Sequence, residues 1–356
     1  MKSHSPSMDV YRNVTHLKNV PYGEYLLYKK ERFPFLDKIT KLKSLDILYE
    51  KLSRPIMLDC ETINTCTNDC IICAYGKMRR KKTIMPMKRF EKVLHDYSEM
   101  GGGYLSLTPR GEIFLDPFLI ERMSLLEKYP RIKGTSVTTN AIPVDRFSDR
   151  DLRQILNSFR KIHISIYGLD GEEYSLMTQR DFYSRMVSNT KKIVELIDRD
   201  NTAICFGFRL LKAHSEKDIG DWIKDNLGTD DIPYGYTYTY TNFRGAVNNK
   251  MPLPFEARWQ KRTQGKSHCL MPLIECAIYS NGDVSYCPCT EFDIINEFKL
   301  GNIDDLSLSD IFNSDKNKEL WNDLPETCLS CSFYCPINMP SQLMSVFQDP
   351  IGHIGG

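Results

Sequence analysis

Hydrophobic and polar positions follow two different periods between about residue 55 and residue 240. Six short segments of this region have the apolar or alternating pattern of β-strands. They are Ile56–Cys60, Tyr104–Thr108, Thr135–Asn140, Ile162–Ile166, Ala203–Leu211 and Tyr234–Tyr240. Because helical stretches separate them, these repeats predict an α/β fold whose parallel sheet curls into a partial (β/α)6 barrel.

The stretches between these strands have the 3.6-residue period of amphipathic helices. Ser148 immediately precedes one of them, in the position of a helix N-cap. The residues that share one helix face are Phe90, Val93, Leu94 and Tyr97 in one run, and Leu152, Ile155, Leu156 and Phe159 in another. We expect these helices to cover the outside of the barrel.

Alternation within the strands predicts which side chains face the barrel interior. In the fourth segment the isoleucines share one face, and His163 and Ser165 share the other. In the fifth segment Cys205, Gly207 and Arg209 lie opposite a row of large apolar residues. Since helices cover the outside, the apolar rows should pack outward and the polar set should line the interior. A polar interior favours an open barrel that holds a polar ligand.

Composition and charge narrow the class of protein. The 356 residues are 41% hydrophobic and 26% charged, which is ordinary for a soluble chain with a real core. The formal net charge of +1 gives no electrostatic argument for binding nucleic acid or an anionic membrane. No apolar run is long enough to span a membrane, and the first residues lack the apolar core of a secretory signal. A cytoplasmic location is therefore expected.

Twelve cysteines are the unusual feature of the composition. Cys66, Cys70 and Cys73 directly follow the first strand, and seven more lie between Cys269 and Cys335. Clustered cysteines in a reducing compartment indicate metal binding. Three thiolates in one loop leave a tetrahedral zinc short of a ligand, but they suit three corners of a [4Fe–4S] cubane whose fourth iron stays open. A zinc or disulfide loop is the alternative interpretation.

The C-x3-C-x2-C run after a first strand resembles the radical S-adenosylmethionine (SAM) superfamily. The resemblance implies that SAM chelates the open iron and is cleaved reductively to a 5′-deoxyadenosyl radical, which takes a hydrogen atom from substrate. It also implies an external electron donor of the flavodoxin or ferredoxin type. The residue before the third cysteine, often aromatic in the family, is here Ile72, so Tyr75 is the candidate for the adenine contact.

Later strand ends carry further parts of the resemblance. Arg110-Gly111-Glu112 resembles the family's Gly-Gly-Glu motif, with the first glycine replaced, and implies that Gly111 and Glu112 receive the SAM ammonium group. Asn140 and Ser165 match positions near SAM and its ribose. Arg180 matches an arginine near the SAM carboxylate, with Arg185 as the alternative. Each of these residues, taken alone, also fits an ordinary capping or surface role.

The C-terminal cysteines resemble the SPASM/twitch extension of radical SAM enzymes, which holds auxiliary iron–sulfur clusters. The matching features are the C-x12-G-x4-C run and the later C-x2-C pair. The preferred ligand set is Cys269, Cys287, Cys328 and Cys331, with Cys335 as a further candidate and Cys276 and Cys289 as surplus. One auxiliary cluster is expected. A zinc ribbon using Cys287, Cys289, Cys328 and Cys331 is the alternative.

We predict three domains: an N-terminal cap over residues 1–54, a radical SAM barrel over 55–264, and an auxiliary cluster domain over 265–356. The 54 leading residues are fewer than the winged-helix domain found in many peptide-modifying relatives, which favours a small carbohydrate-like or natural-product substrate. The four tyrosines of the strand 234–240 would suit stacking on a sugar, but they also fit a buried strand, which is the commoner explanation.

The reaction expected on such a substrate is dehydrogenation, epimerisation or a related rearrangement. Cys205 is a candidate hydrogen-atom donor, with Cys289 and Cys335 as alternatives, and His163 is a candidate base, although both Cys205 and His163 also fit structural interior positions. A peptide-modifying maturase that epimerises or cross-links its substrate is the second functional hypothesis. A zinc-stabilised binding protein without catalysis is the third.

Overall fold

A computed structural model describes residues 54–55, 57–107, 110–247, 251–261, 269, 271–288, 292–293, 297–323 and 325–332. The N-terminal cap predicted for residues 1–54 lies, apart from Arg54, outside the described residues. Within the described ranges, no helix combines the length and the apolar character needed to cross a membrane.

The core of the fold is one curved sheet in the order β11-β10-β9-β1-β2-β3-β4-β5-β6. All pairs from β1 to β6 are parallel. Their bounds are β1 (Met57–Cys60), β2 (Gly103–Ser106), β3 (Ile132–Thr139), β4 (Lys161–Ile166), β5 (Ala203–Arg209) and β6 (Tyr234–Thr237). The six predicted strands and the partial (β/α)6 barrel are therefore confirmed.

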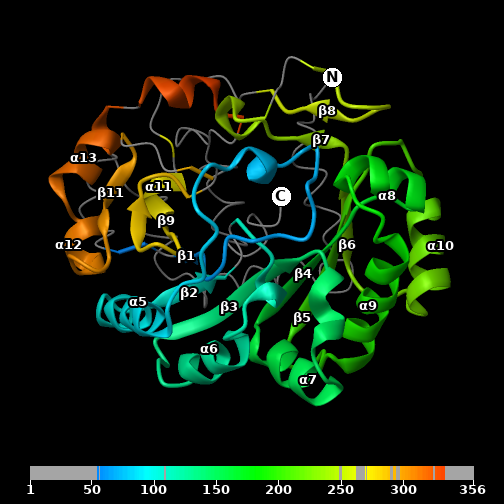
Figure 1. The fold of residues 1–356 in the computed structure, drawn as a ribbon, viewed down its shortest axis with the longest axis horizontal. Helices are drawn as coiled ribbons and strands as arrows, with labels where there is room; N and C mark the ends of the chain where they lie inside the picture. Colours follow the sequence, from blue (N-terminus) through cyan, green and yellow to red (C-terminus); the bar gives the residue numbers. More distant parts are fainter. Residues whose placement is uncertain are drawn as a thin grey trace, which may run out of the picture.

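Helices cover the convex side of this sheet, while the loop after β1 lies on its concave side (Figure 1). Ser148 caps its helix as predicted, since its side chain accepts a hydrogen bond from the Asp151 amide. The α-helices are α5 (Met87–Glu99), α6 (Leu119–Leu126), α7 (Asp149–Ser158), α8 (Gly171–Thr178), α9 (Tyr183–Leu196), α10 (Glu216–Leu227), α11 (Met271–Ile274), α12 (Leu308–Phe312) and α13 (Asp315–Asn322). Short 3-10 turns are η1 (Ala74–Lys77), η2 (Ile113–Leu115), η3 (Ile142–Arg146), η4 (Phe243–Gly245) and η5 (Glu326–Ser330).

The two faces of the sheet differ as the alternation predicts. Ile162, Ile164 and Ile166 of β4 belong to the large hydrophobic cluster under the helices, together with the apolar row of β5. The inward positions instead form polar or small rows across the strands, where His163 is in register with Cys205 and Ser165 with Gly207. The barrel interior is therefore suited to a polar ligand.

The aromatic strand departs from the sequence expectation in its continuity. It is broken, because β6 ends at Thr237 and the next two residues of strand, β7 (Thr239–Tyr240), pair with β8 (Arg258–Trp259) in a separate small sheet. In addition, Tyr234 and Tyr236 lie in register with Phe206 and Phe208 on the helix-covered face and pack against that core. Tyr238 packs against the same core and Tyr240 is buried. These contacts favour the buried-strand interpretation of the four tyrosines over stacking on a sugar.

The C-terminal segment continues the barrel sheet. β9 (Glu275–Ile278) pairs parallel to β1, and β10 (Asp283–Ser285) and β11 (Lys299–Asn302) follow in antiparallel order. Cys276 lies in β9 on the helix-covered face, inside the main hydrophobic cluster. Its exclusion from the preferred ligand set agrees with this position, since a buried core cysteine behaves as a small apolar residue.

A buried ion pair joins α6 to the loop that follows β2. Arg122 donates from Nε to Asp116 Oδ2 at 2.8 Å, and both side chains are fully buried. The Arg122 guanidinium also donates to the Met85 carbonyl and lies over the Phe90 ring, 4.9 Å from its centroid. Asp116 in turn accepts from the Phe118 amide at the start of α6.

Replacing Arg122 by Leu should lower the free energy of unfolding by about 3–5 kcal/mol, because it leaves the Asp116 carboxylate buried without a counter-charge. The double variant Asp116→Leu/Arg122→Leu should recover part of this loss, since it removes both charges. Urea unfolding followed by circular dichroism measures both changes. Lys217→Ala, which removes an exposed pair on α10, is the control. A single Arg122→Leu variant as stable as this control would contradict the account.

Candidate functional site

The loop that carries Cys66, Cys70 and Cys73 is anchored at both ends. Ile63 forms an antiparallel bridge with Ile84, and the Asn64 side chain donates to the Lys81 carbonyl at 2.9 Å and accepts from the Thr83 amide at 2.7 Å. Further along, Cys70 and Ile72 pack in a small apolar cluster with residues of the barrel rim. The loop is therefore fixed at the carboxyl end of β1, where parallel α/β folds place their active sites.

The three cysteines of this loop lie together at the barrel rim, where Cys70 is buried and Cys66 and Cys73 are half-buried. Burial raises the pKa of Cys66 to about 12 and that of Cys73 to about 11, and it raises the pKa of Cys70 further above its ordinary range. The charges of Cys66 and Cys73 each add to the shift at Cys70, so the sulfur atoms face a common space. As bare thiolates they would be costly, and a cationic iron cluster in that space would remove the cost.

The chemistry of these donors fits an iron–sulfur cluster. Three thiolates leave a tetrahedral zinc ion one ligand short. A [4Fe–4S] cubane takes one thiolate at each of three irons and leaves the fourth iron open.

The segment 110–112 lies directly against the cysteine loop. A Cβ atom on Gly111 would stand 2.5 Å from the Ile63 carbonyl oxygen and 3.0 Å from that of Thr65, so only glycine fits. The Glu112 amide donates to the Thr65 carbonyl at 2.8 Å. The motif residue Gly111 thus serves close packing, which brings Glu112 to the loop.

Glu112 is buried, and most of the hydrogen-bond acceptor positions of its carboxylate are occupied by protein donors. It accepts from the Thr139 hydroxyl and the Asn140 amide, each at 2.8 Å, and from the Phe114 amide at 3.2 Å. Burial raises its pKa to about 7 despite these bonds. A carboxylate has about four acceptor positions. The described residues occupy three of them, which leaves one on Oε2 for an ammonium group.

Asn140 and Tyr75 both hold the cysteine loop. Asn140 donates from Nδ2 to the Thr67 hydroxyl at 2.9 Å and toward Cys66 Sγ at 3.6 Å, so it links the loop to Glu112. The Tyr75 hydroxyl accepts from the Cys66 amide at 2.9 Å, and Lys82 Nζ lies 3.7 Å from the ring centroid. Tyr75 therefore stabilises the loop through its hydroxyl, and Lys82 covers one face of its ring.

The two arginines proposed for the SAM carboxylate differ in position. Arg180 donates from Nε to the Thr67 carbonyl at 3.4 Å, next to Cys66. Arg185 forms two 2.7 Å hydrogen bonds with Asp145 in an exposed ion pair. Arg180 is thus the better candidate of the two.

The inward row of β4 and β5 lies beside the loop. Arg209 donates from Nε to Ser165 Oγ at 3.4 Å, and its charge acts on Cys70 and Cys73. The sequence analysis placed Arg209 in the interior but did not single it out as a site residue. Strand alternation was the signal, since a cation on the inward row near three thiols is a candidate for an anionic ligand.

His163 and Cys205 are neighbours in the barrel interior. A Cβ atom on Gly207 would stand 2.2 Å from His163 Nε2, so the glycine makes room for the ring. Burial, followed by the charges of Arg209 and Lys161, lowers the pKa of His163 to about 3. The imidazole is therefore neutral and a weak base, and its buried Nδ1 has no hydrogen-bond partner within the part of the chain that the structure describes. Cys205 is buried, with its thiol 3.9 Å from the Ile162 carbonyl.

The preferred auxiliary ligands are all within the described residues. Cys287 and Cys328 belong to one apolar cluster with Phe298, and the Cys331 amide donates to the Cys328 carbonyl at 3.2 Å. Cys269 is half-buried. The other candidates, Cys289 and Cys335, lie outside the described residues, so the zinc-ribbon alternative stays open.

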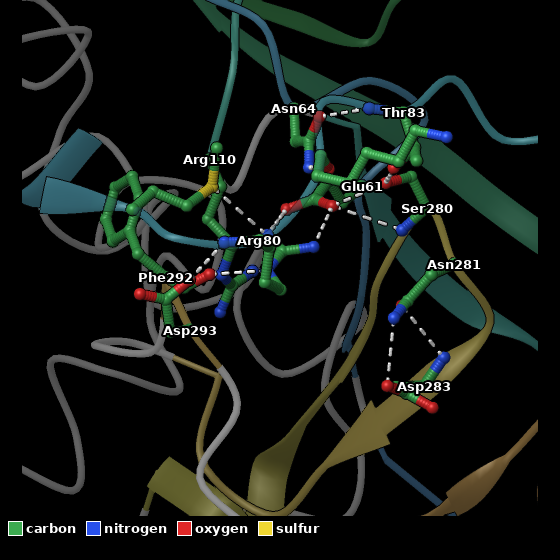
Figure 2. A network of polar contacts seen from close by, with 12 residues as sticks. Glu61, Asn64, Arg80, Thr83, Arg110, Ser280, Asn281, Asp283, Phe292 and Asp293 are labelled. Atoms are coloured by element: carbon green, nitrogen blue, oxygen red, sulfur yellow. Dashed lines mark hydrogen bonds and ion pairs between the residues drawn. The ribbon is translucent and has the colours of Figure 1, made fainter. Parts of the chain in front are cut away.

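A buried network ties the first loop to the C-terminal segment. Glu61 accepts two hydrogen bonds from the Arg80 guanidinium, at 2.9 and 2.7 Å, and two from Ser280, at 3.1 Å from the amide and 2.8 Å from the hydroxyl. The amides of Arg79 and Arg80 donate to Asp293 at 2.8 Å (Figure 2). The two cysteine-bearing regions therefore form a continuous structure.

Comparison with solved structures finds the same fold at low sequence identity. SuiB of Streptococcus suis bound to precursor peptide SuiA is 17% identical with a TM-score of 0.57, and the match covers 86% of this chain and 82% of that one. SuiB bound to S-adenosylmethionine is 18% identical with a TM-score of 0.52, and the match covers 85% of this chain and 74% of that one. BtrN in complex with AdoMet and 2-DOIA is 15% identical with a TM-score of 0.49, and the match covers 76% of this chain and 86% of that one.

Comparison with curated proteins finds no match. Two family models match the sequence itself: the radical SAM superfamily over residues 60–224 and the SPASM iron–sulfur cluster-binding domain over residues 269–332. The first contains the anchored cysteine loop, and the second begins at Cys269 and ends just after Cys331. The chain is thus a member of the radical SAM superfamily that carries a SPASM domain C-terminal to its barrel.

Proposed function

We propose that this enzyme cleaves SAM reductively at the Cys66, Cys70 and Cys73 loop and takes a hydrogen atom from a small polar substrate held in the barrel. The observation that carries the proposal is the arrangement of three cysteines in one loop with Glu112 and Asn140 placed against it. When bound, a [4Fe–4S] cluster supplies the electron that converts SAM into methionine and the 5′-deoxyadenosyl radical.

The chain's own residues then have distinct tasks. Glu112 binds the SAM ammonium group through its remaining acceptor position, in a charge-assisted hydrogen bond. Arg180 and Arg209 supply positive charge for the carboxylate of SAM or for an anionic group of the substrate. Ser165 is the candidate for the ribose contact. The apolar cluster around Cys70 and Ile72 limits the access of water to that side of the site, which protects a reactive radical.

The polar interior supports a small carbohydrate-like or natural-product substrate. His163 Nδ1 offers an unused hydrogen-bonding position beside Cys205. Because the pKa of His163 is lowered, we assign this ring to substrate hydrogen bonding rather than to proton removal. Cys205 is the nearest candidate for returning a hydrogen atom, which would give an epimerised product.

Peptide modification is the second candidate function. Its support is the fold shared with SuiB, whose structure was solved with a precursor peptide. An epimerisation or cross-link on a peptide needs the same SAM chemistry, so the two candidates differ only in the substrate. A zinc-stabilised binding protein without catalysis is the remaining alternative, and it predicts a colourless protein.

Replacing Cys66, Cys70 and Cys73 together by Ala should abolish 5′-deoxyadenosine formation, because the first cluster loses every protein ligand. Anaerobically reconstituted protein should lose about four iron and four sulfide per chain at the same time. Reduction with dithionite in the presence of SAM, followed by chromatography, measures the product. Cys60→Ala is the matched control, since this buried cysteine faces Met85 and the helices. Persistent SAM cleavage in the triple variant would overturn the proposal.

Glu112→Gln should weaken SAM binding by about tenfold to a hundredfold, because a hydrogen bond to a charged group contributes about 1.5–3 kcal/mol. Calorimetric titration of the reconstituted protein under anaerobic conditions gives the dissociation constant. Glu127→Gln, at the exposed end of α6, controls for loss of a carboxylate. Equal SAM affinity in the two variants would exclude the ammonium contact.

Deuterated substrates should distinguish the two candidate functions. With carbohydrate-like compounds deuterated at ring carbons, the proposal expects deuterium in 5′-deoxyadenosine, detected by mass spectrometry. Deuterium transferred only from labelled peptides would instead support the second candidate. The same assay with Cys205→Ala tests the donor, since unchanged epimerised product in that variant would remove Cys205 from the mechanism.

A further inference from the structure

Arg110 stands at the motif position that the family gives to glycine, and it faces away from the SAM side of the segment. Glu112 points to Thr139 and Asn140, next to the first cysteine loop. Arg110, two residues earlier, donates from Nη2 to the carbonyl of Pro288, the residue that follows Cys287. One short segment therefore contacts both cysteine-bearing regions.

The Arg110 guanidinium is held in place by several contacts. Its side chain is only 4% exposed, and the guanidinium lies over the Tyr279 ring, 4.5 Å from the centroid. Arg80 also lies 4.5 Å from the centroid of that ring. Since Tyr279 is itself fully buried at the end of β9, Arg110 has little freedom to move.

The two buried guanidiniums at this junction are matched by two carboxylates. Arg80 is paired with Glu61 by two hydrogen bonds. Asp59, an inward residue of β1, is the carboxylate left to balance Arg110, and Tyr279, Glu61 and Cys287 also lie within electrostatic range of its guanidinium. Through its hydrogen bond to the Pro288 carbonyl, this guanidinium is held next to Cys287. A buried cation beside a cluster thiolate stabilises the reduced, more negative cluster.

We propose that Arg110 is a positioning residue for the auxiliary iron–sulfur cluster, whose reduction potential it raises through its guanidinium beside Cys287. This inference rests on the proposed ligation of that cluster by Cys269, Cys287, Cys328 and Cys331. Its consequence is an auxiliary cluster that accepts an electron more readily, as oxidation of a substrate radical requires.

The test uses the full chain with Cys66, Cys70 and Cys73 replaced by Ala, so that only the auxiliary cluster is observed. Redox titration followed by electron paramagnetic resonance gives its midpoint potential. Arg110→Gln should lower the equilibrium constant for one-electron reduction at least tenfold, which is about 59 mV. Arg110→Lys retains the charge but loses the planar stacking on Tyr279, so its potential should lie between those of the parent and Arg110→Gln. Arg79→Gln, which removes a guanidinium that is 88% exposed, should change nothing.

Asp59→Asn provides a second measurement that does not depend on the folding of the Arg110 variants. It removes the competing carboxylate and should raise the potential, the opposite direction to Arg110→Gln. General loosening of the structure would shift both variants in the same direction, and that result overturns the inference.

Equal potentials in the parent, Arg110→Gln and Asp59→Asn would also overturn the role of Arg110 while leaving the proposed function intact. A parent chain without iron and sulfide would instead remove the auxiliary cluster, and the inference with it.

Discussion

Three sulfur atoms buried in one short loop are stable as thiolates only when positive charge is held among them. In this chain the loop after β1 is held by the Ile63–Ile84 bridge and by Asn64, which fixes the position of the three cysteines. Their raised pKa values express the same constraint. Residues of the neighbouring strands contact this loop or act on it. Asn140 joins the loop to Glu112, and the Arg209 guanidinium places a positive charge near Cys73.

The SPASM segment joins the barrel sheet next to the strand that carries the cysteine loop. β9 pairs with β1, the strand that leads into the cysteine loop, and Glu61 joins Arg80 to Ser280 directly beyond that strand. A buried carboxylate with four hydrogen bonds fixes the relative position of the two regions. At this junction Arg110 donates a hydrogen bond to the carbonyl of Pro288, the residue after Cys287. Electron transfer between two sites benefits from such a fixed separation.

Much of the fold and the first site follows from sequence pattern. Period-2 alternation in β4 and β5 correctly separates the isoleucine row from His163 and Ser165, because one face must pack on helices. For Tyr234 and Tyr236 the sequence left both sugar stacking and a buried strand open, since alternation alone does not say which face of a tyrosine–glycine strand is covered, and the structure agrees with the buried strand. Arg110 was read only as a departure from a motif. Its partners Tyr279 and Pro288 are about 170 residues away in sequence, and only tertiary structure brings them together.

The most direct test of the account is Mössbauer spectroscopy of the chain reconstituted with ⁵⁷Fe after the auxiliary cysteines Cys269, Cys287, Cys328 and Cys331 are replaced by Ala. The account predicts one [4Fe–4S] cluster in which a single iron differs from the other three, and a change at that iron alone when SAM is added. A spectrum without a cubane, or a cubane whose four irons do not respond to SAM, would contradict the central claim.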